Sequence, residues 1–282
     1  MSSLKAWIQA SRLRTLPLSI SGILVGAGMA ARTDFFNWNI FALALLATLG
    51  FQVLSNYAND YGDGVKGTDN EDRVGPARAM QSGLLTASDL KKGIILTSVL
   101  TIIVVVILIY LAFGADRLIL SLIYMILGIS AIIAAIKYTV GSGAYGYKGL
   151  GDVFVFLFFG LVGVMGSYFL YAQLLPLEQF LGATTIGLLS TVVLHLNNMR
   201  DRVQDQKVGK NTLAVLLGPK GAVRYHNFLF GTSILSWIGY LLLSQAKPIL
   251  FLSCLAFFPL LKHFIKVQKT KDHVLLLSLI HI

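Results

Sequence analysis

The sequence predicts an all-α protein, a polytopic transmembrane helical bundle. Of its 282 residues, 56% are hydrophobic and only 13% are charged, and the mean hydropathy is +0.74. A soluble chain is roughly 45–50% apolar and about 25% charged, so this chain has too little charge to cover a water-facing surface. The same composition, with a single cysteine, excludes a disordered chain, a disulfide scaffold and a simple nucleic-acid binder.

Eight apolar runs that lack Asp, Glu, Lys and Arg are the second observation. A bilayer core needs about 20 mostly apolar residues per helix, and a backbone in lipid must satisfy its own polar groups, so each run predicts a transmembrane helix. A last run, 274–282, is too short to cross as a helix, so we expect a ninth span to be short or incomplete. The predicted spans cover roughly residues 16–31, 39–57, 94–114, 118–136, 153–175, 180–197, 226–244 and 248–261.

The first run also has features of a cleavable signal peptide. Lys5, Arg12 and Arg14 precede it, and a stretch rich in small residues, 26–31, ends it. Because the chain keeps Met1 and seven further apolar runs follow, we interpret the first run as a permanent span.

The distribution of Lys and Arg orients these spans. If the N-terminus is cytoplasmic and the spans alternate, the inner segments hold all of the 23 Lys and Arg residues except Arg32, Arg117 and Lys247. This excess follows the positive-inside rule, so we expect a cytoplasmic N-terminus. The net charge of +10 is then explained by topology and by attraction to anionic head groups or substrates, without nucleic acid.

Acidic residues are predicted to gather on the same inner side, in two clusters. One cluster lies at the inner end of the second span and the other at the inner end of the sixth. The order of segments suggests a duplicated four-helix unit, about 10–140 and 150–265, within a single domain, 1–282. The acidic residues outside this side are Asp34, Asp116 and Glu178.

Each cluster places polar side chains on one face of a helix. At 100° per residue, four side chains of the first cluster fall within an arc of about 100°. The three glycines that follow predict that the helix loosens toward a loop. The first arc consists of Asn56, Asn59, Asp60 and Asp63, and the glycines are Gly62, Gly64 and Gly67. A similar arc in the second cluster consists of Asn197, Asp201, Gln204 and Asp205.

Carboxylates one helical turn apart repel each other, and a divalent cation removes that repulsion by binding several of them. The available ligands are all oxygen, which suits Mg²⁺, and Mg²⁺ commonly completes its shell with substrate phosphates. Two Asp-rich helix ends therefore predict a diphosphate clamp. The alternative is that the acids pair, as solvated loop charge, with Arg73, Arg78, Arg200 and Arg202.

Basic residues on the inner side are candidates to contact phosphate oxygens directly. The candidates are Arg14, Lys66, Lys148, Lys207 and Lys210. Each can instead serve only the positive-inside distribution, although Lys66 and Lys207 stand next to an acidic cluster. His195 precedes the second cluster and could act as a base, but we favour a role in helix packing.

The segment 137–152, between the fourth and fifth spans, is rich in Gly and Tyr. It could bring backbone close to a ligand, with Tyr138 facing a nearby cation, or it could be a flexible connector with interfacial tyrosines. The Gly- and Phe-rich span 153–175 predicts either close helix packing or the wall of an apolar cavity.

The motifs Asn59-Asp60-x-x-Asp63 and Asp201-x-x-x-Asp205 are similar to those of the UbiA superfamily of intramembrane aromatic prenyltransferases. Within it, the sequence most resembles the 1,4-dihydroxy-2-naphthoate polyprenyltransferase branch of menaquinone synthesis. The resemblance extends in consistent order over about residues 10–260. The similar strings are residues 14–17, 59–69, 73–76, 145–151, 156–160, 197–205, 209–210 and 212–215.

The resemblance implies a nine-helix bundle in the inner (cytoplasmic) membrane, with an active site that opens to the cytoplasm. It implies that Mg²⁺ on the prenyl diphosphate is bound by Asn59, Asp63, Asp69, Asp201 and Asp205. The implied catalytic carboxylates are Asp60, Asp63, Asp201 and Asp205, with Asp60 and Asn197 also supporting neighbouring ligands. Together with the candidates chosen above for their chemistry, the predicted substrate-binding residues are Arg14, Lys66, Tyr138, Lys148, Asn197, Lys207 and Lys210.

The implied reaction transfers a polyprenyl group from polyprenyl diphosphate to 1,4-dihydroxy-2-naphthoate. CO₂ and pyrophosphate are lost, and a demethylmenaquinol forms. Relatives that act on 4-hydroxybenzoate carry Asp where this chain has Gly67, and Asp69 follows two residues later. This shift fits the naphthoate branch.

Three alternatives stay open. A related prenyltransferase could use 4-hydroxybenzoate or homogentisate. A CDP-alcohol phosphotransferase would also use Asp and Mg²⁺, but its compact motif needs an Ala-Arg pair closer to Asp63 than Ala77-Arg78. An ion-coupled transporter would place its acids near the bilayer midplane, whereas these are predicted at span ends.

Overall fold

The computed structural model describes residues 4–69, 75–270 and 276, and every regular element within them is helical. This confirms the predicted all-α class. The chain divides into two compact units. Unit 1 takes residues from Met1–Asp72, Pro76–Gly146 and Gly166–Leu174, and unit 2 takes Arg73–Gly75, Tyr147–Met165 and Leu175–Ile282.

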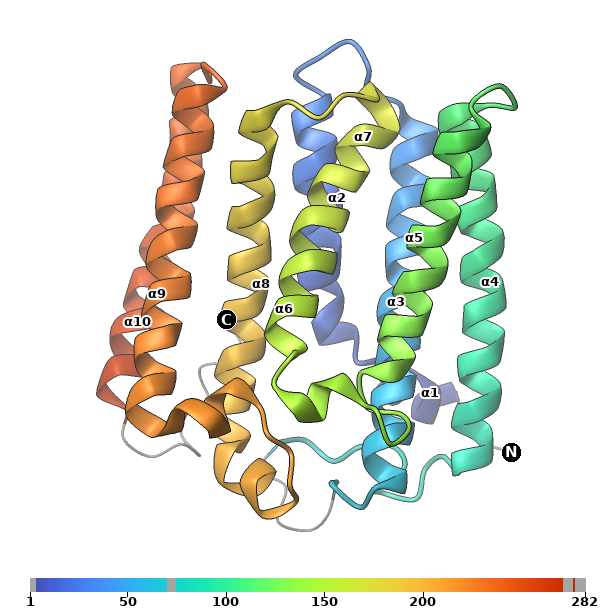
Figure 1. The fold of residues 1–282 in the computed structure, drawn as a ribbon, viewed down its shortest axis with the longest axis vertical. Coiled ribbons are helices and arrows are strands. Elements are labelled where there is room, and N and C mark those ends of the chain that lie inside the picture. The colour runs from blue at the N-terminus through green and yellow to red at the C-terminus, as the bar shows by residue number, and fades with distance from the viewer. Residues whose placement is uncertain (1–3, 70–74, 271–275, 277–282) are drawn as a thin grey trace. The chain divides into compact units, whose positions relative to one another are not determined.

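Unit 1 is organised around one long helix that carries the first acidic motif. This helix, α3, packs against α2, α4 and α5, and Figure 1 shows α3 and α4 running side by side. Asn37 caps the start of α3, and a capping box between Thr86 and Asp89 starts α4. The elements are α1 (Leu4–Ser11), η1 (Leu13–Thr15), α2 (Leu16–Ala30), α3 (Trp38–Val65), α4 (Ala87–Phe113), α5 (Leu118–Lys137) and α7 (Ser167–Ala172).

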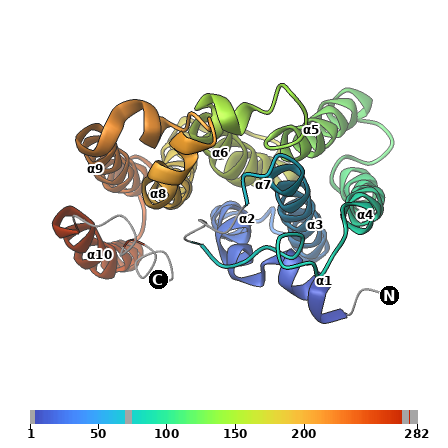
Figure 2. The ribbon, with the colours of Figure 1, turned by 90° about the horizontal axis from the view of Figure 1, so that it is seen from below.

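Unit 2 is organised around α8, which carries the second acidic motif. It packs against α6 and along α9, as the view from below shows (Figure 2). Gly218, with a positive φ, and Pro219 break the helical path near the start of α9. The elements are α6 (Gly151–Val155), η3 (Phe156–Gly166), α8 (Leu177–Lys207), α9 (Leu213–Leu243), η4 (Pro248–Ala256) and α10 (Phe257–Lys269), while η2 (Tyr145–Lys148) lies at the boundary between the units.

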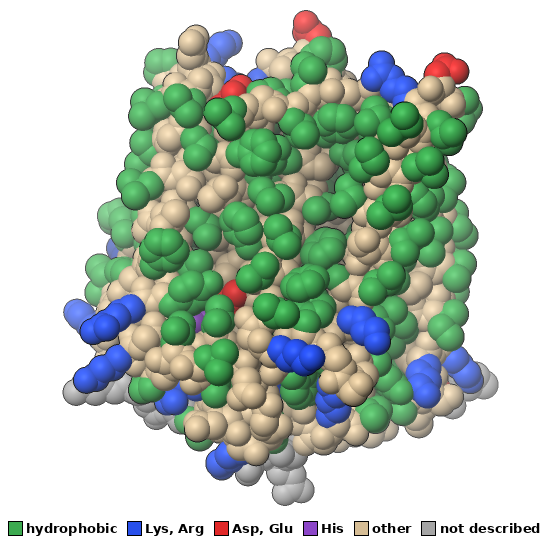
Figure 3. All heavy atoms as spheres, viewed as in Figure 1, with side chains coloured by type: hydrophobic (Ala, Val, Ile, Leu, Met, Phe, Trp, Pro, Cys, Tyr) green, Lys and Arg blue, Asp and Glu red, His purple; other side chains and the backbone are tan. Residues whose placement is uncertain are grey.

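Eight helical segments of the described residues are long and apolar enough to cross a membrane. Their side chains explain why, since much of α4 exposes large aliphatic groups such as Ile95, Val99 and Ile103. On the face shown in Figure 3, hydrophobic side chains cover the length of the helices, and Lys and Arg lie mainly toward helix ends. The multi-pass membrane prediction is therefore confirmed. The predicted short ninth run, 274–282, lies outside the described residues except for Leu276.

The prediction that α3 loosens at its glycines was wrong for Gly62 and Gly64. The helix continues to Val65, and the chain leaves it at Gly67, which has a φ of 70°. Gly62 is needed for contact, because a Cβ there would lie 2.4 Å from Thr139 Oγ1 and 2.8 Å from the Thr139 backbone. Met80 fills the space beside Gly64 in the same way.

Close helix packing also explains the glycines of the fifth span. A Cβ on Gly160 would lie 2.7 Å from the carbonyl oxygen of Ala183, and Gly187 faces it across the same contact. The contact joins η3, whose helix is of the π type, to α8. Of the two interpretations of residues 153–175, the structure supports close packing at this position.

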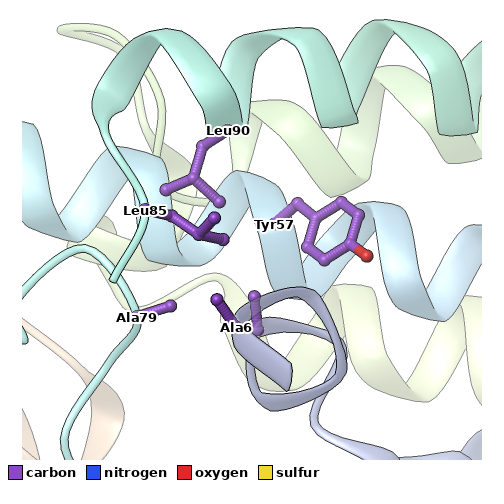
Figure 4. Packing of buried hydrophobic residues seen from close by; sticks show 6 residues of the cluster. Ala6, Tyr57, Ala79, Leu85 and Leu90 are labelled. Atoms are coloured by element: carbon purple, nitrogen blue, oxygen red, sulfur yellow. The ribbon is translucent and has the colours of Figure 1, made fainter. Parts of the chain in front are cut away.

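A small apolar core fixes the segment that follows the first motif. Ala79 and Leu85 pack against Ala6 of α1, Tyr57 of α3 and Leu90 of α4, as Figure 4 shows. All five are buried. Residues 79–85 are therefore held against the end of α3, where the acidic side chains lie.

Candidate active site

The polar face predicted for the first motif lies on α3, but its members make different contacts. Asn56 is 2% exposed, and its Nδ2 donates to the carbonyl oxygen of Ser11 at 2.8 Å and to Thr15 Oγ1 at 3.0 Å. Tyr57 reaches the same turn, with its hydroxyl 2.8 Å from Ser11 Oγ. These two side chains hold the start of the chain against α3, so their polar groups are already hydrogen-bonded within the protein.

The Asp60 carboxylate is also hydrogen-bonded within the protein, in this case to two backbone amides. Its two carboxylate oxygens accept hydrogen bonds from the N–H groups of Ala79 at 3.0 Å and Met80 at 3.2 Å, and the residue is 1% exposed. A buried carboxylate needs such partners, and both of its oxygens have one. Asp60 therefore anchors the turn that contains Arg78.

Asp63 and Asp69 share that arginine. Arg78 Nη2 lies 3.7 Å from Asp63 Oδ2, and Arg78 Nε lies 3.5 Å from Asp69 Oδ2. The Thr68 amide donates to the carbonyl oxygen of Asp63 at 3.0 Å, and the turn that this bond closes precedes Asp69, whose carboxylate lies near the same guanidinium. The three side chains are buried to 12% exposure or less. The predicted alternative, pairing of the acids with arginine, is thus realised here, but in a buried group and not in solvated loops.

The glycine- and tyrosine-rich segment packs against the same end of α3. Thr139 is fully buried, and its hydroxyl donates to the carbonyl oxygen of Ala58 at 3.0 Å and lies 3.3 Å from Asn59 Oδ1. Tyr145 donates to the carbonyl oxygen of Ala134 at 2.9 Å, and burial, with a smaller effect of Tyr138, raises the pKa of Tyr145 so that it stays a neutral donor. These contacts favour a loop that supports a site over a flexible connector.

The second motif lies on the last turns of α8. Asp201 pairs with Arg200, whose Nε donates to Oδ1 at 2.6 Å. Asp205 is 4% exposed, and its carboxylate lies 3.9 Å from Lys210 Nζ. Asn197 donates to the carbonyl oxygen of Val193 at 2.9 Å, so its amide oxygen is directed away from that bond. The predicted helical face is present, and each carboxylate has a nearby cation.

The loop after α8 contacts the second half of the Gly/Tyr-rich segment. Lys210 Nζ lies 5.4 Å from the centre of the Tyr147 ring, and the Asn211 amide donates to the carbonyl oxygen of Tyr147 at 3.1 Å. Lys148 and Lys207 are exposed in this unit. Within unit 2, the structure thus gathers three predicted lysines around the end of α8.

Predicted residues of unit 1 gather at the motif end of α3. Arg14 lies within the turn that Asn56 holds, between Ser11 and Thr15, and Lys66 directly follows α3; both are exposed. Sequence reasoning missed Thr139 and gave Arg78 only as part of an alternative. Neither residue has a periodic pattern around it, and Arg78 lies two residues beyond the family-like string 73–76. Arg73 lies outside the described residues.

His195 is confirmed as a packing residue. It is fully buried, with Nε2 3.0 Å from the carbonyl oxygen of Ala222 and Nδ1 3.4 Å from Asp152 Oδ2. The Tyr225 ring meets it edge-on at 4.9 Å. His195 therefore links α8 to α6 and α9, and Asp152 is a partner that the sequence pattern did not reveal.

The donor set fits a magnesium ion that shares its shell with a phosphate. Within residues 4–69, 75–270 and 276, no three His, Cys, Asp or Glu side chains lie close enough to form a metal site alone. The described part of unit 1 offers two carboxylates, Asp63 and Asp69, and the amide oxygen of Asn59. Mg²⁺ is usually bound in this way, by one or two carboxylates, waters and substrate phosphates.

Comparison with known proteins places the chain in a family. The model of the UbiA prenyltransferase family matches residues 19–275. The chain is 45% identical over 234 residues to a 1,4-dihydroxy-2-naphthoate octaprenyltransferase of Escherichia coli, covering 83% of this chain and 75% of the relative. It is 43% identical over 267 residues to the Haemophilus influenzae protein of the same name, covering 94% and 86%.

The fold has a solved counterpart. The structure of a UbiA homolog from Archaeoglobus fulgidus, bound to DMAPP and Mg²⁺, superposes with a TM-score of 0.72 at 14% identity, covering 98% of this chain and 96% of that one. Since the family model matches most of the chain and the bacterial relatives exceed 40% identity, the chain belongs to the UbiA prenyltransferase family.

Proposed function

We propose that this protein transfers a polyprenyl group from polyprenyl diphosphate to 1,4-dihydroxy-2-naphthoate, as a multi-pass enzyme of the inner membrane whose active site faces the cytoplasm. The observation that carries the proposal is the 45% and 43% identity to two bacterial 1,4-dihydroxy-2-naphthoate octaprenyltransferases. The chemistry of the two acidic motifs is consistent with it.

The proposed metal ligands are Asn59, Asp63 and Asp69 of the first motif and Asp201 and Asp205 of the second. A bound Mg²⁺ would supply positive charge that stabilises the departing pyrophosphate. Support for this cofactor comes from the oxygen-only donor set and from the Mg²⁺ and DMAPP bound to the solved UbiA homolog. We assign both motifs to the same diphosphate.

The chain's other polar groups would support and extend that site. Asp60 holds the turn beside the first motif, and Asn197 holds its position on α8 next to the second. Four lysines would contact phosphate oxygens and so favour breakage of the allylic C–O bond. They are Lys66, Lys148, Lys207 and Lys210.

The acceptor must be held with its electron-rich ring facing the allylic carbon. Arg14, Lys148 or a nearby arginine would bind its carboxylate, and the Tyr138 ring would face the allylic cation. A carbon–carbon bond then forms between ring and prenyl group, the C–O bond to pyrophosphate breaks, and the carboxylate leaves as CO₂. The product is a demethylmenaquinol.

The test is a product assay on membranes that contain the protein. We expect 1,4-dihydroxy-2-naphthoate and a prenyl diphosphate to give a prenylated, decarboxylated product whose formation stops when EDTA removes Mg²⁺. Parallel reactions with 4-hydroxybenzoate and homogentisate identify the acceptor by product mass. Product formation in EDTA, or preference for another acceptor, would contradict the proposal.

A further inference from the structure

We propose that Arg78 is a built-in counter-ion for the first acidic motif. In the metal-free protein its guanidinium neutralises Asp63 and Asp69, and a divalent cation that binds these carboxylates displaces it. The inference rests on the proposed function only in taking Asp63 and Asp69 as metal ligands. It adds that metal affinity at this motif is set by an exchange between Arg78 and the cation.

The geometry of Arg78 is that of a loosely held charge. Its distances to the two carboxylates, 3.7 and 3.5 Å, exceed those of a charge-assisted hydrogen bond, about 2.7–2.9 Å. Arg78 Nε and Nη1 are buried, and neither donates a hydrogen bond to any residue that the structure describes. The guanidinium is therefore attracted to both carboxylates without being fixed to either.

In the second motif, an arginine pairs with a carboxylate in a different geometry. Arg200 meets Asp201 in a two-pronged pair, with Nε donating to Oδ1 at 2.6 Å and Nη2 donating to Oδ2. That geometry is typical of a committed Arg–carboxylate pair. Arg78 instead lies near two carboxylates and forms a short hydrogen bond with neither. This is the arrangement expected of a cation that a metal ion displaces.

The backbone of Arg78, unlike its side chain, is firmly held. Asp60 binds the amides of Ala79 and Met80, and Ser82 N donates to the carbonyl oxygen of Arg78 at 2.9 Å. Ala79 is also part of the apolar core around Tyr57 (Figure 4). Because the backbone is fixed and the side chain keeps 12% exposure, the guanidinium can move away without unfolding the turn.

Charge repulsion favours an exchange between the Arg78 guanidinium and a metal ion at these carboxylates. Two buried carboxylates that lie near the same guanidinium repel each other, so they need a cation when no metal is present. A divalent ion on both carboxylates would stand next to the guanidinium as a like charge. Removal of the arginine charge should therefore tighten metal binding and destabilise the metal-free protein.

The experiment measures Mn²⁺ binding to the purified full-length protein in detergent micelles, without prenyl diphosphate, by the electron paramagnetic resonance signal of free Mn²⁺. We expect Arg78→Met to bind Mn²⁺ about tenfold more tightly than the wild type, since a competing charge is gone. Its melting temperature should be lower without Mn²⁺ and rise more on Mn²⁺ addition. The matched control is Lys92→Met, which removes an exposed positive charge from the same unit and should leave Mn²⁺ affinity unchanged.

The Asp63→Asn variant separates this inference from the proposed function. If wild type and Asp63→Asn bind Mn²⁺ equally, the metal role of the motif fails. If Asp63→Asn weakens binding but Arg78→Met leaves it unchanged or weakens it, the counter-ion inference alone is overturned.

A second measurement, on the wild-type protein, covers the case in which Arg78→Met does not fold. Modification of Arg78 by phenylglyoxal, followed by peptide mass spectrometry, should increase when Mn²⁺ is added, and an unchanged or smaller yield contradicts displacement.

Discussion

Among single residues, neighbouring acids of the first motif are distinguished by what surrounds them. Asp60 and Asp63 are separated by less than one helical turn, yet Asp60 binds backbone amides and Asp63 faces Arg78. The spacing in the sequence gives both the same helical face. Only the turn at residues 78–82, which returns to α3 in three dimensions, assigns them different roles.

Asp60→Asn should lower stability more than it lowers intrinsic chemistry. The amide can accept one backbone hydrogen bond but presents an N–H₂ group to the other, so a buried donor stays unsatisfied at a cost of about 2 kcal/mol. Thermal unfolding in detergent should show a clearly lower melting temperature. Asp34→Asn, an exposed acid on the other side of the predicted membrane, is the control, and equal melting of the two variants would contradict the anchoring role.

Thr139→Val should raise the Mg²⁺ concentration that the enzyme requires while leaving the shape of the buried loop largely unchanged. The substitution removes the hydroxyl that lies 3.3 Å from Asn59 Oδ1, and loss of a group that orients a metal ligand typically costs about tenfold in metal affinity. The measurement is the Mg²⁺ concentration for half-maximal product formation. Thr139→Ser keeps the hydroxyl and should behave as the wild type, whereas equal effects of both substitutions would show that the hydroxyl is unimportant.

At the scale of elements, the hydropathy pattern located every transmembrane span, but it did not predict where the two motif-bearing helices, α3 and α8, end. The apolar run 39–57 stops where the polar motif begins, but α3 continues to Val65, and α8 likewise continues to Lys207. The extra turns are stable because their polar side chains find partners in neighbouring segments. A sequence pattern reports the side chains that face lipid, and it contains no information about such partners.

Gly62→Ala tests the close contact that lets α3 carry the motif past Thr139. A Cβ would lie 2.8 Å from the Thr139 carbonyl carbon, so the loop must shift, at a cost of about 1–3 kcal/mol. We expect a lower melting temperature and a higher Mg²⁺ requirement, because Asn59 is bound to the same loop. Gly28→Ala, where no atom lies within 4 Å of an added Cβ, is the control and should retain wild-type stability.

At the scale of the whole molecule, the sequence predicted the class and the number of clear spans, and the eight candidate helices confirm them. The internal repeat and the cytoplasmic N-terminus stay predictions. In unit 1, hydrogen bonds place Ser11, Ala58, Ala79 and Thr139 at one end, so the basic residues beside them share that end. This is the arrangement from which the positive-inside rule predicts a cytoplasmic side.

The orientation can be tested with a membrane-impermeant maleimide. In a Cys254→Ser background, Ser142→Cys places a thiol in the exposed loop before η2, and Asp34→Cys places one in the exposed loop after α2. We expect labelling of the Ser142→Cys protein in inverted vesicles and of the Asp34→Cys protein in intact spheroplasts. The reverse pattern would place the motif end outside and remove its access to cytoplasmic substrates.

The central claim is that the two acidic motifs act on one prenyl diphosphate. Its most direct test is the rate of prenyl transfer to 1,4-dihydroxy-2-naphthoate by Asp63→Asn, Asp201→Asn and the double variant, at saturating Mg²⁺. Each single substitution should reduce the rate about 100-fold or more, because each removes charge that stabilises the same leaving group. Residues that act as a unit are not additive, so the double variant should be little worse than the worse single variant. Full activity of either single variant, or losses that multiply in the double variant, would show that the motifs do not share a substrate.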